Sequence, residues 1–507
     1  MPSDLAVSSK VLIVGAGPVG CTTAAALADA GFTDITVADR RTDPTVFEWE
    51  RAYSLVLHQS GQKLLRSLPG LGEVVKHEAV SQHVRVDAVI SPDGAVSMSS
   101  RRPPAGPVYW LLKTRMLQVL DEYVRSRYPT VRFITGASVT EVQLPTPPPA
   151  GTLPSRRTQV TLSRATDGTE QQLEVDLLIA CDGSNSSVRT MFSKLGSQVD
   201  SKYGTGVYSQ PSPSTGLRHK GVVLDSRPII SPPGAPVQYA EASVTYTLRG
   251  ARVGRNPSTV FDMLVLPVSG QAGVSRRGAI TVSPGHALLE VKDTDEALQL
   301  FRDNFPQLRV DDFVSREEMD KFVMIRASEF PPITRPYSLV ARFRHAPRQG
   351  GVLFIGDAAH AFPPDAAQGI NSAMQDVDAL LGVARSITAS RASVHDLLSA
   401  YEKARHAETW ALMELAAVAA PYQYGQNRLG AARAAASKSL RGALAAVAPG
   451  IVWPHVDKLI RQGLTYDAVR RRNRRSLAAI RVLGAALLLA PLAVAAAARR
   501  SSMEVEE

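Results

Sequence analysis

The sequence has few of the features that characterise secreted, disulfide-linked or metal-binding proteins. Its 507 residues include only two cysteines, Cys21 and Cys181, which are too few for a disulfide framework or a cysteine-rich metal site. The N-terminal segment MPSDLAVSSK contains no apolar run of the kind that forms the centre of a signal peptide. We therefore expect no export and no metal, and we expect both cysteines to be buried small side chains.

A nucleic-acid partner is not indicated either, although the chain is basic. The formal net charge is +10, from 57 lysines and arginines against 47 aspartates and glutamates. Much of this charge lies between Arg470 and Arg500, and no RNA-binding or DNA-binding motif accompanies it. The remaining composition, 44% hydrophobic and 21% charged, is that of a large globular protein with a sizeable core.

The first informative motif is a glycine-rich turn near the N-terminus. The apolar run VLIVGAGPVG carries Gly15, Gly17 and Gly20, and a small-residue helix over 21–30 and a second apolar strand follow it. In such a unit the first glycine makes the tight turn, the second lets the backbone approach a pyrophosphate, and the third lets helix and strand pack closely. The pattern predicts a nucleotide-binding βαβ unit whose helix N-terminus faces the phosphates.

An acidic residue follows at the position expected for ribose recognition. Asp39 ends the second strand, ITVAD, about 20 residues after the glycines. A carboxylate there accepts hydrogen bonds from a ribose 2′-hydroxyl and disfavours a 2′-phosphate. NADP is therefore not the expected occupant of this site.

Two later motifs indicate which nucleotide binds. DLLIACDGSNSSVR is an apolar strand that stops at Asp182 and Gly183. GGVLFIGDAAHAFPPDAAQGINSAMQ is another apolar strand, which stops at Gly356 and Asp357 and runs through a proline loop into a helix that starts near Gln368. The three motifs, spread over the first three quarters of the chain, make sense together as one flavin site.

These motifs resemble those of the single-component, FAD-dependent aromatic hydroxylases of the para-hydroxybenzoate hydroxylase fold. The resemblance implies an α/β protein: a Rossmann-like FAD-binding domain of the GR2 type with an interleaved β-sheet substrate domain. It also implies FAD as cofactor, NADPH or NADH as co-substrate, molecular oxygen, and a small aromatic or lipophilic substrate. The flavin supplies the oxygen-transfer chemistry, so the protein contributes orientation and a dry pocket. The residues expected to bind the cofactor are Gly15, Gly17, Pro18, Val19, Gly20, Asp39, Arg40, Arg115, Asp182, Gly183, Gly356, Asp357, Pro364, Gln368, Gly369, Ile370 and Asn371.

Within this family the chain is similar to the kynurenine 3-monooxygenase branch. The segments RAYSLVLHQSGQKLLRSLPGLGEVV, YWLLKTRMLQVLDEYVRSRYPTVRF and FRDNFPQL occur in the same order as similar segments of that branch. The resemblance implies hydroxylation of an aromatic substrate, with Asn371 and Gln375 at the start of the helix facing the flavin ring as candidate substrate contacts. No catalytic residue is assigned, and His360 is expected to pack or hydrogen-bond beside the FAD loop.

The chain departs from this branch at positions that bear on the substrate. Asp365 stands where the branch carries one of a pair of phenylalanines, so an additional acid is expected beside the flavin. It is either a base that activates a phenol or aniline, or an ordinary solvated loop residue. Asp87 and Pro103 stand near the positions of the arginine and tyrosine that hold the substrate carboxylate in the branch, and Arg85 is the candidate replacement.

Rival functions stay open. The same fold supports epoxidases and reductases of lipophilic substrates, and a flavin-bound membrane interaction module with little turnover would carry the same motifs. A flavin halogenase is disfavoured because its Trp-x-Trp-x-Ile-Pro signature is absent. The four tryptophans are Trp49, Trp110, Trp410 and Trp453.

The C-terminus carries an uncharged stretch between arginines. VLGAALLLAPLAVAAAA, residues 482–498, lies between Arg481 and Arg499, and as a helix it would span about 25 Å. That is close to the lower limit for crossing a hydrocarbon core of about 30 Å, and the flanking arginines suit lipid headgroups. We expect membrane attachment by this tail, facing the cytosol and at the mitochondrial outer membrane. A helix packed on the protein or lying in the interface is the alternative.

The expected domain organisation follows from these landmarks. Residues 1–205 and 328–390 form a discontinuous FAD-binding domain, with a small inserted sheet built from strand-like runs at 84–90, 131–134 and 159–162. Residues 206–327 form the substrate domain, 391–475 a C-terminal helical region covering the active site, and 476–507 the hydrophobic tail.

Overall fold

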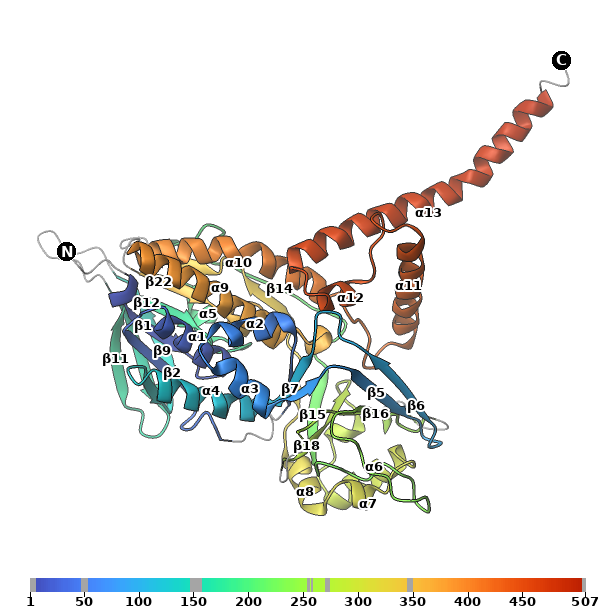
Figure 1. Cartoon of the computed structure of the whole chain (residues 1–507), viewed down its shortest axis with the longest axis horizontal. Helices are drawn as coiled ribbons and strands as arrows, with labels where there is room; N and C mark the ends of the chain where they lie inside the picture. The colour runs from blue at the N-terminus through green and yellow to red at the C-terminus, as the bar shows by residue number, and fades with distance from the viewer. Residues whose placement is uncertain are drawn as a thin grey trace, which may run out of the picture.

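The computed structural model contains two large β-sheets, each covered by helices, and a long C-terminal helix that projects from the body (Figure 1). It describes residues 6–46, 53–145, 157–252, 256, 259–269, 274–343 and 350–503, and it describes no side chains after residue 486.

The first large sheet carries the three flavin motifs. Its strands run in the order β13-β21-β22-β12-β1-β2-β8. Their bounds are β13 (Val199–Asp200), β21 (Val340–Phe343), β22 (Gly351–Phe354), β12 (Leu177–Ala180), β1 (Lys10–Val14), β2 (Asp34–Asp39) and β8 (Arg132–Thr135). The strands from β22 to β8 are parallel, so the carboxyl ends of β1, β12 and β22 meet at one edge.

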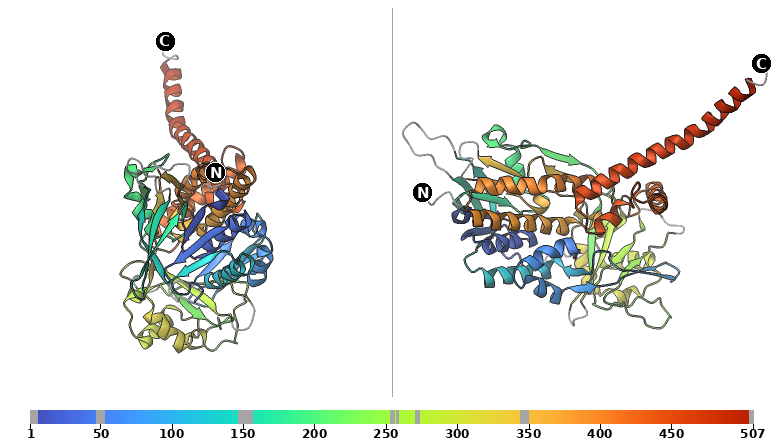
Figure 2. Two further views of the ribbon diagram at one scale, coloured as in Figure 1. Left: turned by 90° about the vertical axis from the view of Figure 1, so that its left-hand side faces the viewer. Right: turned by 45° about the horizontal axis from the view of Figure 1, so that its top comes forward.

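The small sheet of β9 (Ala137–Gln143), β10 (Thr158–Arg164) and β11 (Glu170–Val175) lies against one face of this sheet, and helices cover the other face (Figure 2). The helices of this part of the chain are α1 (Pro18–Asp29), α2 (Gln59–Ser67), α3 (Leu71–Glu78), α4 (Lys113–Arg127), α5 (Ser187–Ser193), α9 (Gly369–Ser390) and α10 (Val394–Ala416). The central strands are accordingly apolar throughout, because parallel strands with both faces covered have no solvent side. Cys21 and Cys181 are buried in this core, as expected, and burial raises the pKa of Cys21 to about 12.

The second large sheet, called the substrate sheet below, takes β15 to β18 from residues 206–327, the range predicted to form the substrate domain. Its order is β19-β15-β18-β17-β16-β5-β6. The bounds are β19 (Ser328–Glu329), β15 (Arg218–Leu224), β18 (Arg276–Val282), β17 (Met263–Val265), β16 (Thr245–Leu248), β5 (Arg85–Ile90) and β6 (Val96–Arg101). Three helices cover one face: α6 (Thr294–Asn304), α7 (Val310–Phe313) and α8 (Arg316–Met324). Phe301, Phe305, Phe313 and Phe322 from these helices belong to its core.

The expectation of one small inserted sheet is wrong. The three strand-like runs assigned to it lie in three different sheets: β5 pairs with β16 of the substrate sheet, β8 is the edge of the FAD sheet, and β10 lies between β9 and β11. Alternation of apolar and polar residues predicts a strand but does not specify its partner. The smaller sheets are β9 (Ala137–Gln143), β10 (Thr158–Arg164) and β11 (Glu170–Val175); β3 (Ser54–Leu57), β7 (Val108–Leu112) and β4 (Val80–Gln82); and β14 (Val207–Gln210) with β20 (Ile333–Pro336).

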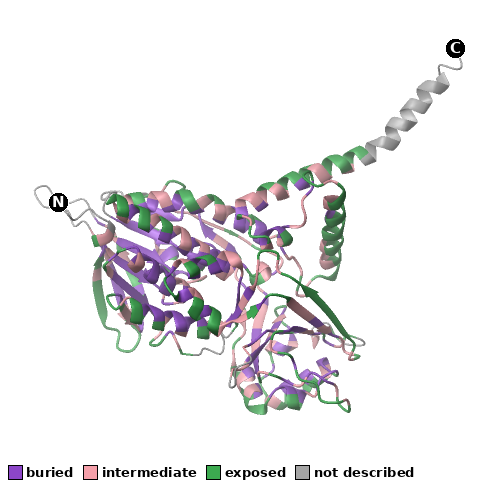
Figure 3. Ribbon diagram, viewed as in Figure 1, coloured by how far each residue is buried: buried purple, intermediate pink, exposed green. Residues whose placement is uncertain are grey.

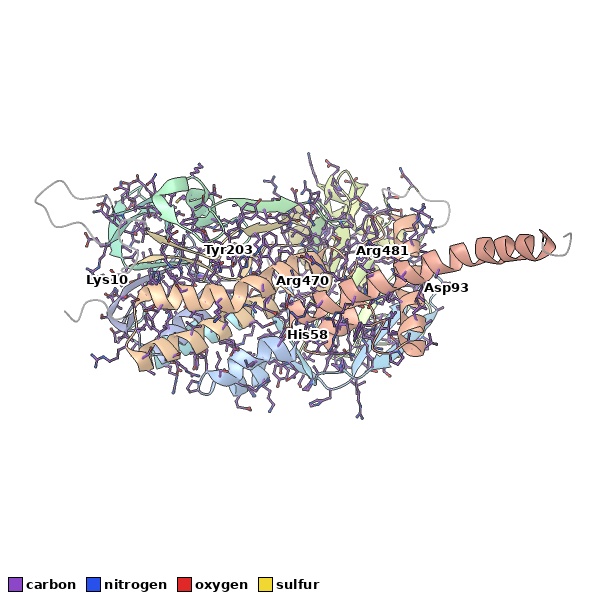
Figure 4. The ribbon with its side chains drawn as sticks, turned by 90° about the horizontal axis from the view of Figure 1, so that it is seen from above. Lys10, His58, Asp93, Tyr203, Arg470 and Arg481 are labelled. Atoms are coloured by element: carbon purple, nitrogen blue, oxygen red, sulfur yellow. The ribbon has the colours of Figure 1, made fainter. Side chains whose placement is uncertain are left out.

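The C-terminal region is helical but does not form a tight bundle. Its helices after α10 are α11 (Arg428–Val447), α12 (Val456–Arg461) and α13 (Tyr466–Met503). Arg441 is the one buried residue of α11, which is exposed along most of its length (Figure 3). The first turns of α13 pack against α10, while Arg481 lies farther along α13, toward the end that leaves the body (Figure 4).

Within the described side chains, no helix combines the length and apolar composition that crossing a bilayer requires. Residues 487–498 of the uncharged stretch lie beyond the described side chains. Membrane attachment by the tail therefore stays a prediction.

Candidate functional site

In the glycine turn after β1, two of the three glycines have no room for a side chain, and the third faces open space. Gly15 has φ +103°, and a Cβ there would lie 2.5 Å from the carbonyl oxygen of Cys181. A Cβ at Gly20 would lie 1.8 Å from the Gly15 carbonyl oxygen, whereas a Cβ at Gly17 would meet no atom within 4 Å. Pro18 is the first residue of α1. The backbone at Gly17 is therefore free to be approached by a pyrophosphate at the helix N-terminus.

Asp39 lies at the carboxyl end of β2 with its carboxylate turned to this glycine turn. Its Oδ2 accepts a hydrogen bond from the backbone N–H of Ala16 (2.8 Å), and its Oδ1 accepts from the backbone and Nε of Arg41 (2.8 and 2.9 Å). Burial alone would raise the pKa of Asp39, but the hydrogen bonds from Arg41 outweigh it and lower the pKa. The side chain is thus an ionised acceptor beside the ribose position, while the neighbouring Arg40 is exposed.

The middle motif contains an unsatisfied acceptor. Asp182 Oδ2 accepts from the Ser187 hydroxyl and the Val188 backbone N–H, both at 3.2 Å. Asp182 Oδ1 is buried and has no partner among the described residues. Gly183 adopts φ +85°, which lets the chain turn away at this point. A buried carboxylate oxygen without a donor fits a ligand hydroxyl.

Arg189 joins the middle motif to the late one. It lies in α5 and is buried, and its Nη1 donates to the carbonyl oxygens of Asp357 (3.1 Å) and Ala358 (2.9 Å). Its backbone N–H is capped by the Ser186 hydroxyl at 2.9 Å. Sequence reasoning did not assign this role to Arg189, the last residue of the motif.

The late motif positions an exposed aspartate among buried neighbours. Gly356 has φ +64°, and a Cβ there would lie 3.2 Å from methyl groups of Val19 and 3.3 Å from Ala373. Asp357 is exposed although Gly356 and Ala358 are buried, and its Oδ1 lies 3.9 Å from the Cβ position of Gly369. Val19, Gly356, Asp357 and Gly369 are thus brought together at one edge of the FAD sheet.

A buried ionic cluster holds this loop. Asp376 of α9 accepts the backbone N–H of Gly356 (3.0 Å), lies 2.5 Å from His360 Nε2, and pairs with Arg405 of α10 at 2.7 Å. Burial alone would raise the pKa of Asp376, but the charges of His360 and Arg405 lower it. His360 therefore bonds beside the FAD loop, as expected. Sequence reasoning missed Asp376 and Arg405; the one signal was an acid on the apolar face of a predicted helix.

The start of α9 is tied to both neighbouring elements. Asn371 is fully buried, accepts the His58 backbone N–H (2.7 Å) and donates to the Val56 carbonyl (2.8 Å). The same nitrogen also donates to the Ala367 carbonyl (3.0 Å), so both amide N–H groups are used to hold α9, and the predicted contact with substrate has no free donor on this side chain. The predicted residues Pro364 and Ile370 are exposed and half-buried respectively.

Gln368 and Gln375, the other two polar residues of this region, hydrogen-bond to the same tyrosine of α13. The hydroxyl of Tyr466 donates to Gln368 Oε1 at 2.9 Å and accepts from Gln375 Nε2 at 3.1 Å. Tyr466 is buried, so the first turn of α13 rests directly on the helix predicted to face the flavin. Gln375 stays a predicted substrate contact.

Arg115 lies on the first turn of α4 and is engaged elsewhere. Its guanidinium pairs with Glu78 through two hydrogen bonds of 2.8 Å, and its side chain is 46% exposed. The hydrogen bond with Glu78 raises the pKa of Arg115. Its predicted contact with the flavin stays a prediction.

Arg85 belongs to a cluster with more positive than negative charges. Arg85 Nε lies 2.8 Å from Asp87 Oδ1, and Arg101 Nη2 lies 3.3 Å from Asp87 Oδ2. Arg461, the last residue of α12, has no hydrogen bond within the described part of the chain; burial and the charges of Arg101 and Arg85 lower its pKa. Burial, together with Arg461 and Arg85, also lowers the pKa of His58 to about 4. The cluster therefore lies close to His58 and to the start of α9.

Comparison with known proteins agrees with this geometry. A protein-family model described as FAD binding domain matches residues 8–205 and 325–416, which is more than half of the chain. The chain belongs to this FAD-binding family.

The chain is also similar to named enzymes and to solved structures. The chain is 27% identical to kynurenine 3-monooxygenase of Salinispora arenicola over 509 residues, covering 97% of this chain and 96% of that one. It is 26% identical to kynurenine 3-monooxygenase of Cryptococcus neoformans over 393 residues, covering 74% and 68%. The tetrameric form of 2-methyl-3-hydroxypyridine-5-carboxylic acid oxygenase has the same fold, with a TM-score of 0.54 at 19% identity and coverage of 84% and 96%.

This FAD-binding protein is an FAD-dependent monooxygenase, with NADPH or NADH as co-substrate. The predictions of an α/β FAD-binding fold, of FAD as cofactor and of the enzyme class are thereby confirmed, and the epoxidase, reductase and membrane-module alternatives are not favoured. The cofactor fits the residues present, because Gly17 is open, Asp182 Oδ1 lacks a partner and Asp357 is exposed at the same sheet edge.

Proposed function

We propose that this enzyme hydroxylates a small aromatic substrate that carries a carboxylate, as kynurenine does. The observation that carries the proposal is the arginine cluster of Arg85, Arg101 and Arg461 around Asp87. Arg85 and Arg101 share the Asp87 carboxylate and Arg461 lies near both without a hydrogen bond of its own among the described residues, so an anionic group of the substrate would balance the remaining charge. The names of the kynurenine 3-monooxygenase relatives support the same substrate chemistry.

Different residues of the chain would bind the different parts of the cofactor and the substrate. When bound, FAD supplies the transfer of oxygen to the ring. The open backbone at Gly17 and the N-terminus of α1 would hold the pyrophosphate, and Asp39 the adenosine ribose. Asp182 and Asp357 would accept hydrogen bonds from the remaining polar groups of the cofactor. The substrate-side residues orient the ring and exclude water.

The test is NADPH consumption by the FAD-loaded protein with and without L-kynurenine, with the product identified by mass. Stimulated consumption and a product heavier by one oxygen are expected if the arginine cluster replaces the carboxylate-binding pair of the branch. Protein that holds FAD but shows no stimulation by any carboxylated aromatic compound would contradict the proposal.

We also propose that the C-terminal stretch 482–498 attaches the enzyme to a membrane, with the mitochondrial outer membrane as the expected location. The support is the length of the uncharged run and the arginines at its ends. Flotation of the full chain with phosphatidylcholine vesicles should be lost in Leu488→Asp, whereas Ser502→Asp should float normally. Equal flotation of both variants would contradict this role.

A further inference from the structure

The FAD site does not suit the 2′-phosphate that distinguishes NADPH from NADH. The sequence contains a single Gly-x-Gly-x-x-Gly turn, after β1, and the Asp39 carboxylate beside it disfavours a 2′-phosphate. If the enzyme distinguishes the two co-substrates, it does so with cationic side chains elsewhere, next to a space that admits a phosphate group.

A cavity of about 310 Å³ with three arginines in its wall lies between the substrate sheet and α11. Its lining residues are Arg249, Arg252, Gly425, Arg428 and Ala431. Arg249 directly follows β16, and Arg428 is the first residue of α11. The volume is at the lower end of the range for small-molecule sites, so the cavity suits one group of a ligand rather than a whole dinucleotide.

Asp262 holds two of these arginines together. Its Oδ2 accepts from Arg249 Nη1 at 2.6 Å, and its Oδ1 accepts from Arg252 Nη2 at 3.0 Å. The backbone is also fixed here, because the Arg249 carbonyl accepts from Gln307 Nε2 at 2.8 Å. Each guanidinium has five N–H groups, so both arginines keep donors for a ligand.

Arg428 contributes the third guanidinium, from a different element. Within the described residues it forms no hydrogen bond and no ion pair. The Asn427 side chain accepts the Gly430 N–H at 2.8 Å and caps α11, and the N-terminus of this helix adds a partial positive charge beside the cavity. Three arginines and one carboxylate leave an excess of two positive charges. One phosphate monoester would balance this excess, because it carries a charge of about −1.5 to −2 at pH 7.

A short segment connects the cavity to the loop that precedes α9. Gln423 Nε2 donates to the Asp365 carbonyl (3.2 Å) and to Asp365 Oδ1 (3.3 Å), and Asp365 belongs to the 3-10 turn η7 (Pro364–Ala366). Gly425 follows two residues after Gln423, so their Cα atoms lie within about 8 Å of each other. A dinucleotide held in the cavity by one phosphate therefore has the flavin loop close by.

We propose that the cavity formed by Arg249, Arg252 and Arg428 binds the 2′-phosphate of NADPH and thereby makes NADPH the preferred co-substrate. Arginine suits this role because its planar guanidinium donates two hydrogen bonds to one phosphate group. The site discriminates because NADH carries a hydroxyl at this position and would leave the excess charge unbalanced. Binding of the co-substrate phosphate does not depend on which aromatic compound the enzyme hydroxylates.

The test is isothermal titration of the FAD-loaded protein with NADP⁺ and with NAD⁺, which needs no turnover. The wild-type protein should bind NADP⁺ more tightly, because only NADP⁺ carries the 2′-phosphate. Arg428→Ala should raise the dissociation constant for NADP⁺ roughly 10-fold and leave that for NAD⁺ unchanged. Arg433→Ala removes an exposed arginine of the same helix outside the cavity, and this matched control should bind both nucleotides as the wild type does. An equal loss for both nucleotides, or a loss for neither, would overturn the proposal.

Adenosine 2′,5′-bisphosphate and adenosine 5′-phosphate give a second readout, because they differ only in the 2′-phosphate. The bisphosphate should displace NADP⁺ from the wild-type protein far better than the monophosphate, and Arg428→Ala should lose this difference. Arg428→Lys, which keeps the charge but not the paired donors, should retain part of it. If the two compounds displace NADP⁺ equally well from the wild-type protein, the cavity does not recognise the 2′-phosphate.

Discussion

Two clusters of charged residues in this molecule differ in their burial and in their charge balance. Asp376 lies between His360 and Arg405, and all three side chains are almost inaccessible to solvent. Asp87 is shared by Arg85 and Arg101, with side chains 23–54% exposed and Arg461 near enough to feel both arginines. The first cluster is balanced and closed, and the second has an excess of positive charge and is open.

The difference indicates that the buried cluster stabilises the site, whereas the exposed cluster can contact a ligand. A buried charge is tolerated only when it is paired and hydrogen-bonded, and Asp376 uses its remaining acceptor capacity to hold the Gly356 loop. An open cluster with unbalanced guanidinium groups retains the capacity to bind an anion. The structure therefore separates a buried cluster that holds the Gly356 loop from an exposed cluster that retains the capacity to bind an anion.

The largest effect is expected from Asp376→Asn, which breaks the balanced cluster. Arg405 would be left as an uncompensated buried charge, at a cost of about 3–5 kcal/mol in the free energy of unfolding. Urea unfolding of the FAD-loaded protein measures this cost, and FAD should be released at lower urea. Asp378→Asn removes an exposed pair on the same helix and should cost less than about 1 kcal/mol. Similar losses in the two variants would mean that Asp376 does not organise the loop.

A smaller effect is expected from Arg461→Ala, which reduces the excess charge of the open cluster. A hydrogen bond to a charged group is worth about 1.5–3 kcal/mol, so the dissociation constant for a carboxylated aromatic ligand should rise roughly 10-fold to 100-fold. Titration with L-kynurenine, followed by flavin absorbance, measures this change, and the urea midpoint should stay near that of the wild type. Kynuramine, which lacks the carboxylate, should bind both proteins alike. If kynuramine loses affinity by the same factor, Arg461 does not recognise the anion.

The smallest effect is expected from Arg115→Ala, because its pair with Glu78 is balanced but exposed. Loss of such a pair costs about 0.2–1 kcal/mol, and the FAD dissociation constant should hardly change. Glu78→Gln, which frees the guanidinium, is the matched control. A FAD affinity more than about tenfold weaker in Arg115→Ala alone would instead support the predicted contact between Arg115 and the flavin.

The sequence predicts those features of this protein that depend on one short segment, and it does not predict those that depend on contacts between distant segments. The turn at Gly15 and Gly20, the acid at Asp39 and the strand ends at Asp182 and Asp357 were all predicted, because each function depends on backbone geometry within a short segment. The strand at 85–90 was also predicted, but its sheet was not. Its partner β16 lies well over a hundred residues away, and nothing in a single strand specifies that pairing.

The sequence by itself therefore determined the cofactor and the fold class, since glycine turns and strand-end acids carry their chemistry in their spacing. Only the tertiary structure decided which charges are paired. It brought Arg405 to Asp376, Tyr466 to Gln368, and Gln423 to Asp365. The physical reason is that the state of a buried charge or hydrogen-bonding group depends on its neighbours in space, and these come from segments that meet only after folding.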